Sequence, residues 1–193
     1  PGRKVGTTEQ SDEKVVYLTL DDGPSKNTQA VLDILDKYNA KATFFVTGAM
    51  PEYKDMIKKA YDKGHTVGMH TYSHDYAKVY ASVDAYFQDL DQIGQLVKEE
   101  IGYVPCFIRF PGGSSNTISA SYTKGIMTTL TQEVQARGYQ YYDWNGSSGD
   151  GAVRTKDTTV EALPKIIEYY QSQGYVFKAL DLNSYVAHHG VNN

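Results

Sequence analysis

Short apolar runs alternate with amphipathic stretches along most of the 193-residue chain. The apolar runs consist of strand-forming residues and predict six strands, at residues 15–20, 42–46, 65–69, 104–108, 139–143 and 175–180. Between them, apolar residues recur every three or four positions, which predicts five helices at residues 28–38, 52–62, 82–101, 126–137 and 160–173. Strands that alternate with helices are typical of a parallel sheet, so we expect an α/β fold.

Two adjacent carboxylates follow the first predicted strand. Asp21 and Asp22 come directly after Leu18–Leu20, and Gly23-Pro24 then turns the chain. Adjacent side chains of a strand point to opposite faces. A bend at the strand end would nevertheless bring both carboxylates to one pocket, where one could bind a cation and the other could act as a base.

Two histidines follow the third predicted strand. His70 and His74 are four residues apart, a spacing that predicts both rings on one face of a helical turn. Two imidazoles and one carboxylate form a metal-ligand set that leaves positions open for water and substrate. A capped turn would explain the acidic pair alone, and chance would explain the histidine pair alone. Together the two patterns indicate a catalytic metal site.

A third motif, Phe107-Ile108-Arg109-Phe110-Pro111-Gly112-Gly113, follows the fourth strand. With the acidic and histidine motifs, it resembles the polysaccharide deacetylases of the NodB-homology type, carbohydrate esterase family 4. The resemblance runs from about residue 15 to about residue 180 and is closest to bacterial enzymes that deacetylate N-acetylglucosamine in peptidoglycan or chitin-like polymers. It implies a distorted (β/α) barrel of about seven parallel strands, one of which is missing from this chain, and an extracellular or cell-wall location.

The resemblance also implies roles for individual residues. Asp22, His70 and His74 match the ligands of one divalent metal, with zinc expected first and cobalt, nickel or manganese as alternatives. Asp21 matches the general base that deprotonates the attacking water, and Arg109 matches the residue that orients it. The positions expected to contact the glycan are Tyr72, Pro111, Gly112 through its backbone N–H, and Trp144, although Trp144 could equally be a core aromatic residue.

The last two family motifs are incomplete. Asp150 fits the aspartate that tunes a catalytic histidine, but no histidine lies between Gly151 and Thr158, where the family has a strand that ends in this general acid. Either the chain has lost the acid or a segment is missing from the sequence, and omission is favoured because it explains both the absent strand and the absent histidine. His188 and His189 follow the last strand and are predicted to form a solvated tail.

The composition adds few constraints. The net charge of −4 gives no electrostatic reason to expect nucleic acid as a partner, and no run approaches the ~20 apolar residues of a membrane helix. Residues 1–14 are predicted to be a linker, 15–182 the deacetylase domain and 183–193 a tail, in a monomer. The acidic residues of the helices are predicted to lie on solvated faces, namely Asp33, Asp36, Asp89, Asp91, Glu99 and Glu100.

The sequence therefore predicts metal-dependent hydrolysis of N-acetyl groups from a cell-wall polysaccharide. Two alternatives stay open. Removal of O-acetyl groups from acetylated xylan would use the same site residues. A catalytically dead glycan-binding domain would keep the metal ligands and lack the acid.

Overall fold

Seven short strands form the centre of the protein, which is described by a computed structural model over residues 6–7, 12–147 and 157–192. A five-stranded sheet has the order β2-β3-β4-β5-β6, and β1 pairs with β7. Every pairing between these strands is parallel, so the predicted α/β fold is confirmed. The strands are β1 (Val15–Val16), β2 (Leu18–Asp21), β3 (Ala42–Val46), β4 (Thr66–Met69), β5 (Phe107–Ile108), β6 (Gln140–Tyr141) and β7 (Val176–Phe177).

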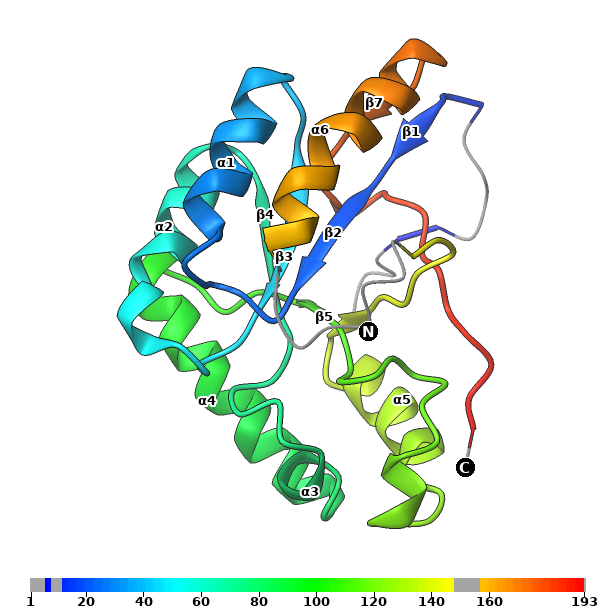
Figure 1. Cartoon of the computed structure of the whole chain (residues 1–193). Coiled ribbons are helices and arrows are strands. Elements are labelled where there is room, and N and C mark those ends of the chain that lie inside the picture. The colour runs from blue at the N-terminus through cyan, green and yellow to red at the C-terminus, as the bar shows by residue number, and fades with distance from the viewer. Residues whose placement is uncertain (1–5, 8–11, 148–156, 193) are drawn as a thin grey trace.

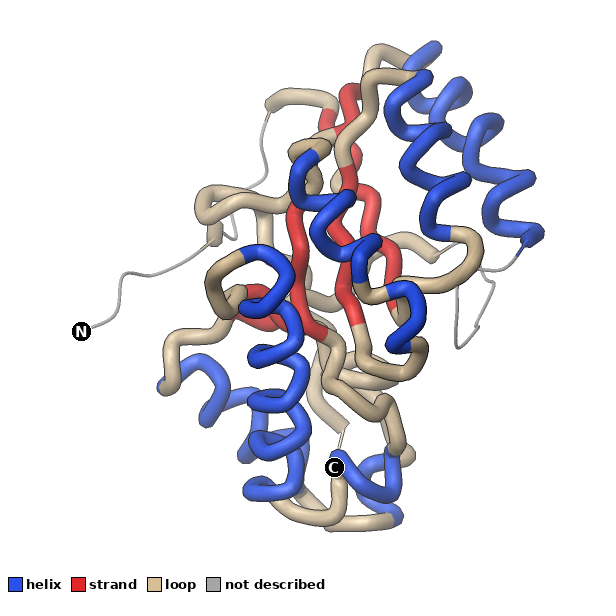
Figure 2. The backbone as a smooth tube through the Cα atoms, turned by 90° about the vertical axis from the view of Figure 1, so that its left-hand side faces the viewer, coloured by secondary structure: helices blue, strands red, loops and turns tan. Residues whose placement is uncertain are grey.

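Helices cover the strands on more than one side, as Figures 1 and 2 show. Each of the five predicted helices is present, and the short helix α3 was not predicted. None of the described helices is both long and apolar enough to cross a membrane. The helices are α1 (Thr28–Lys37), α2 (Asp55–Asp62), α3 (Tyr76–Val79), α4 (Val83–Ile101), α5 (Ile126–Ala136) and α6 (Asp157–Ser172), with 3-10 turns at Pro51–Tyr53 and Ser119–Ser121.

The core lies between the central strands and the apolar stripes of the helices. All five residues of β3 are buried, which explains why this strand reads as one apolar run without alternation. Helix α4 begins at Ser82, whose hydroxyl accepts a hydrogen bond from the Ala85 N–H at 3.0 Å, and ends at Gly102 with φ of 91°. Its buried face packs the long helix against the sheet and against α2 and α3.

The predicted first strand is divided into two at Tyr17. Its first part, β1, pairs with β7, whereas β2 pairs with β3. One stretch of chain therefore joins the two sheets and leads directly into the acidic pair. The last three strands are shorter than the sequence predicts, although each lies within its predicted range.

The prediction that the C-terminal residues form a solvated tail is wrong. The Asp143 N–H donates a hydrogen bond to the Ala187 carbonyl at 2.9 Å, and the His188 ring stacks on the Tyr141 ring at 3.8 Å. Ser184 and Val186 are buried. The segment, coloured red in Figure 1, therefore packs along β6.

The predicted omission between residues 151 and 158 concerns a stretch of which 151–156 lie outside the described residues, so it stays a prediction. The domain boundaries at residues 14 and 182 also stay predictions. Contacts do join the three predicted regions, because the Gly6 N–H donates to the Leu182 carbonyl at 2.8 Å and Thr7 pairs with Tyr185.

His65 is a structural residue of the core. It is 3% exposed, its Nδ1 accepts a hydrogen bond from the Ala42 N–H at 3.2 Å, and its ring meets the Phe44 ring edge-on. Burial, together with the nearby charge of Lys41, lowers the pKa of His65 from 6.5 to about 4. The unfolded chain therefore binds a proton at a pH at which the folded protein leaves this ring neutral.

The free energy of unfolding should fall as the pH drops from 6.5 towards 4 because of His65. Replacing it by asparagine removes the titrating ring and keeps an acceptor for the Ala42 N–H. In metal-free protein, we expect the wild type to lose about 2 kcal/mol more than His65→Asn between pH 7.5 and pH 5. Urea unfolding at both pH values measures this difference, and equal losses in the two proteins would contradict the assignment.

Candidate active site

The acidic pair lies where β2 ends, and the two carboxylates point to different partners. Asp22 has a positive φ of 66°, which bends the chain directly after Asp21, the last residue of the strand. The Asp21 carboxylate contacts the Arg109 Nη1 at 2.9 Å. The Asp22 carboxylate lies 3.4 Å from His70 Nε2 and 3.2 Å from His74 Nε2. The bend expected from the sequence is thus present.

The histidine pair is brought together by a loop, so the predicted helical turn is wrong. His70 follows β4, and residues 70–75 are irregular. Thr71 and His74 have positive φ values of 65° and 50°, which β-branched and other bulky residues rarely adopt. The ring centroids of His70 and His74 are nevertheless 4.8 Å apart. The loop therefore brings the two rings together, as the spacing predicted, but through irregular backbone and not through a helical turn.

The two imidazoles are prepared to act as metal ligands. His70 Nδ1 lies 2.7 Å from the Arg109 carbonyl, to which it can donate, and its Nε2 then faces Asp22 as an acceptor. Burial lowers the pKa of both His70 and His74. Neutral imidazole is the form that binds metals, so these rings need not lose a proton first.

Asp22, His70 and His74 fit a divalent metal by their chemistry and spacing. Their ligand atoms all lie within 4.8 Å of one another. Two ligands of a tetrahedral zinc ion at 2.0–2.2 Å would be about 3.4 Å apart, close to the observed distances from Asp22 to the two rings. Three protein ligands leave at least one position open, as catalytic zinc sites require.

Asp89 holds the histidine loop in place, and the prediction that it lies on a solvated face is wrong. This residue of α4 is 9% exposed, and its carboxylate accepts hydrogen bonds from the N–H groups of Tyr72 and Ser73 at 2.6 and 2.9 Å. Asp89 directly precedes Leu90 and lies three residues after Tyr86, both of the buried stripe. Its position beside that stripe was the one feature of the sequence that indicated a buried Asp89.

Arg109 is buried and joins β2 to the residues that follow β6. Its Nη1 donates to Thr19 Oγ1 at 2.7 Å and to Asp21 Oδ1 at 2.9 Å. Its Nε and Nη2 donate to the carbonyls of Tyr142 and Asp143, each at 2.9 Å. The guanidinium thus fixes the Asp21 carboxylate from one side and the end of β6 from the other.

The loop after Arg109 is held by two residues that the sequence did not single out. The buried Asp143 carboxylate accepts hydrogen bonds from the N–H and the hydroxyl of Ser114. The Tyr80 hydroxyl donates to the Pro111 carbonyl at 2.7 Å. Between these two anchors, Gly112 and Gly113 have φ values of 76° and 78°, which favour glycine. The backbone of Gly112 is thereby kept at an exposed position.

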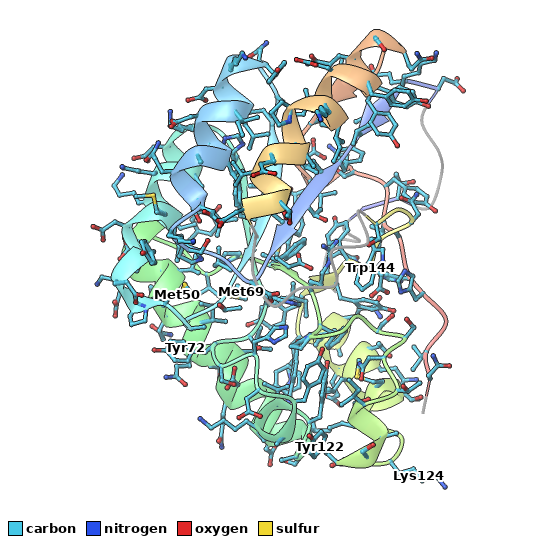
Figure 3. The ribbon with its side chains drawn as sticks, viewed as in Figure 1. Met50, Met69, Tyr72, Tyr122, Lys124 and Trp144 are labelled. Carbon is cyan, nitrogen blue, oxygen red and sulfur yellow. The ribbon has the colours of Figure 1, made fainter. Side chains whose placement is uncertain are left out.

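Trp144 and Tyr72 lie on different sides of the molecule in Figure 3. Trp144 is partly buried, lies over the Arg109 guanidinium with 5.5 Å to its ring centroid, and meets the His189 ring edge-on at 4.8 Å. Tyr72 packs its ring on Gly48, where a Cβ would overlap it. Trp144 therefore belongs to the surroundings of Arg109 rather than to the core. Asp150 lies outside the described residues, so its role stays a prediction.

Comparison with known proteins agrees with the geometry of the site. A sequence model of the polysaccharide deacetylase family matches residues 8–142, which is most of the chain. The chain belongs to this family. Its members are hydrolases, and the resemblance that the three motifs carry is therefore confirmed.

Two curated members illustrate the range of this polysaccharide deacetylase family. The chain is 36% identical over 140 residues to a peptidoglycan-N-acetylglucosamine deacetylase of Bacillus cereus, which covers 72% of this chain and 48% of that protein. It is 32% identical to a bifunctional xylanase/deacetylase of Pseudobutyrivibrio xylanivorans, over 91% of this chain and 31% of that protein. The chain thus spans about half and about a third of these relatives.

Among solved structures, the catalytic domain of a peptidoglycan N-acetylglucosamine deacetylase from Eubacterium rectale shares the fold closely. The TM-score is 0.92 and the sequences are 44% identical, over 96% of this chain and 97% of that chain.

The alignment with the Pseudobutyrivibrio deacetylase is 190 residues long, although it includes only 91% of the 193 residues of this chain. That relative therefore carries residues without a counterpart here, and the place of any omission stays a prediction.

Replacing Asp89 by alanine should weaken metal binding without touching a ligand. The N–H groups of Tyr72 and Ser73 would lose their acceptor, and the loop that carries both histidines would no longer be held. Because such supporting contacts are commonly worth 10–100-fold in metal affinity, we expect zinc affinity to fall by about that factor. Competition with a chelator measures it.

Asp91→Ala is the matched control, since Asp91 is exposed on the same helix. Asp89→Asn should have a smaller effect, because both N–H groups donate to the same oxygen, Oδ1, and an amide oxygen can take its place. Equal zinc affinity in Asp89→Ala and Asp91→Ala would show that the loop does not depend on this carboxylate.

Proposed function

We propose that the protein hydrolyses N-acetyl groups of N-acetylglucosamine residues in peptidoglycan, with one divalent metal, zinc in the first place, held by Asp22, His70 and His74. The observation that carries the proposal is a second carboxylate, Asp21, fixed by Arg109 directly beside this ligand set. The substrate is inferred from the Bacillus cereus and Eubacterium rectale relatives, which are peptidoglycan N-acetylglucosamine deacetylases. Such a substrate would place the protein at the cell wall.

Asp21 is suited to accept a proton at the site. Its side chain is 30% exposed, against 8% for Asp22, so water can reach it. Its negative charge acts on both His70 and His74, which means that it lies close to the metal-ligand set. The ion pair with Arg109 fixes the orientation of the carboxylate.

Different groups of the site would serve different steps of acetamide hydrolysis. A bound divalent ion would supply Lewis acidity, which acidifies a water and polarises the acyl group. Asp21 accepts the proton of the attacking water as the new C–O bond forms. The backbone N–H of Gly112 is the candidate donor to the acyl oxygen. When the C–N bond breaks, acetate leaves, and the proton that Asp21 accepted passes to the sugar nitrogen, which becomes an amine.

Two other functions use the same groups. Removal of O-acetyl groups from xylan is favoured by one observation, the similarity to the bifunctional xylanase/deacetylase. A glycan-binding domain without turnover is favoured by the absence of a histidine in the Gly151–Thr158 stretch of the sequence. The acetate released from peptidoglycan, chitopentaose and acetylated xylan distinguishes the three.

His74→Ala should lower metal content and activity together, because it removes one of three protein ligands. Elemental analysis after dialysis against zinc measures the bound metal, and His188→Ala is the control because His188 lies beside β6 and outside the ligand set. Full metal occupancy in His74→Ala would remove this residue from the ligand set.

Asp21→Asn should keep the metal and lose acetate release by on the order of 100-fold or more, since an amide cannot accept the proton. The wild type should release acetate from peptidoglycan faster than from acetylated xylan. Near-wild-type turnover by Asp21→Asn would refute the assigned base. No acetate from any of the three glycans, with metal bound, would refute the deacetylase and support the binding domain.

A further inference from the structure

Tyr76 lies against three parts of the site and has no role in the reaction described above. Its ring meets the ring of the ligand His74 edge-on, with centroids 5.6 Å apart. Its hydroxyl is close enough to Asp22 for that carboxylate's charge to act on it. A Cβ built on Gly112 would lie 3.0 Å from the Tyr76 hydroxyl. The phenol therefore stands between the metal-ligand set and the loop that carries the candidate oxyanion donor.

The position of Tyr76 is fixed by its surroundings. Asp75 caps α3 by accepting hydrogen bonds from the N–H groups of Ala77 and Lys78 at 2.9 and 3.3 Å. The Tyr76 ring also packs against the ring of Tyr80, at 5.9 Å, whose hydroxyl is bonded to the Pro111 carbonyl. Helix α3 is thus joined to the loop that carries Gly112 and Gly113, called the glycine loop below. The Tyr76 hydroxyl therefore keeps its place beside Gly112.

The Tyr76 hydroxyl makes no hydrogen bond with any residue in the described parts of the chain. Partly buried tyrosine hydroxyls usually have a partner. Because residue 112 is a glycine, no side chain fills the space next to this hydroxyl. A phenol with an available O–H, beside a backbone amide and a metal-ligand set, is suited to a substrate oxygen.

We propose that Tyr76 is a further catalytic residue, whose hydroxyl donates a hydrogen bond to the acyl oxygen of the substrate's acetamido group as negative charge develops on it. The inference rests on the proposed deacetylase function. Tyr76 would act together with the Gly112 N–H, so that the oxygen receives one donor from α3 and one from the glycine loop. The phenol keeps its proton throughout, and no bond to tyrosine forms or breaks.

The test compares Tyr76→Phe with the wild type and with Tyr103→Phe, an exposed tyrosine after α4. Phenylalanine keeps the ring contacts and removes only the donor. On a chitooligosaccharide or peptidoglycan fragment, we expect kcat to fall by on the order of 100-fold with KM changed less than about twofold. Zinc content and thermal midpoint should stay at wild-type values, which excludes loss of the fold.

A second readout does not depend on turnover. A glucosamine oligosaccharide with an N-methylphosphonyl group carries anionic oxygens where the reacting acyl group would be. Calorimetry with zinc-loaded protein should show at least about tenfold weaker binding of this analogue to Tyr76→Phe, and unchanged binding of the deacetylated oligosaccharide, because only interactions with the developing charge are lost.

The outcomes separate the inference from the function on which it rests. An active wild type with an equally active Tyr76→Phe, and equal affinity for the analogue, would overturn the role of Tyr76 alone. If Tyr76→Phe bound the analogue and the deacetylated product more weakly by the same factor, the role would be overturned too. Tyr76 would then contribute to binding of the sugar chain and not to the charge that develops on the acyl oxygen. A wild type that releases no acetate would overturn the deacetylase function, and this role with it.

Discussion

The buried guanidinium of Arg109 is the group on which the arrangement of the site depends. Its four hydrogen bonds join the end of β2, through Thr19 and Asp21, to the end of β6, through the carbonyls of Tyr142 and Asp143. It also lies over the Phe45 ring, 4.5 Å from its centroid. Removing an acceptor from a buried guanidinium is destabilising, because its charge then loses part of its compensation. The same side chain therefore stabilises the sheet and orients the candidate base.

The two neighbouring aspartates receive different roles from their surroundings. Asp21 faces a permanent positive charge and retains contact with water, whereas Asp22 is buried against two neutral imidazoles. The positive φ of Asp22 bends the chain between the two residues, so that both carboxylates lie at one site but against different partners. A carboxylate held by arginine is available as a base, and a carboxylate beside two imidazole nitrogens is available as a ligand. Two chemically identical side chains thus become suited to different roles through their positions alone.

The sequence predicts the elements and the reacting groups better than it predicts what holds them. The strands, the longer helices and the convergence of Asp22, His70 and His74 follow from periodicity and from the common edge at which parallel strands end. Asp89 and Asp143 were missed because their partners, the N–H groups of Tyr72, Ser73 and Ser114, are 16 to 29 residues away along the chain. The loop with positive φ at Thr71 and His74 was read as a helical turn because spacing does not specify backbone dihedral angles.

The C-terminal segment shows most clearly why motifs alone do not define this site. Asp143 accepts hydrogen bonds from Ser114 of the glycine loop and, at 2.8 Å, from the N–H of His189, while its own carbonyl accepts from Arg109. The His189 ring in turn reaches Ser115 Oγ at 3.0 Å and the Trp144 carbonyl. One buried carboxylate therefore connects the end of the described chain to the loop that presents the Gly112 N–H. Since a buried carboxylate is costly unless each oxygen is satisfied, displacement of residues 187–189 would also loosen that loop. The segment that was predicted to be a solvated tail thus helps to hold the loop that carries Gly112.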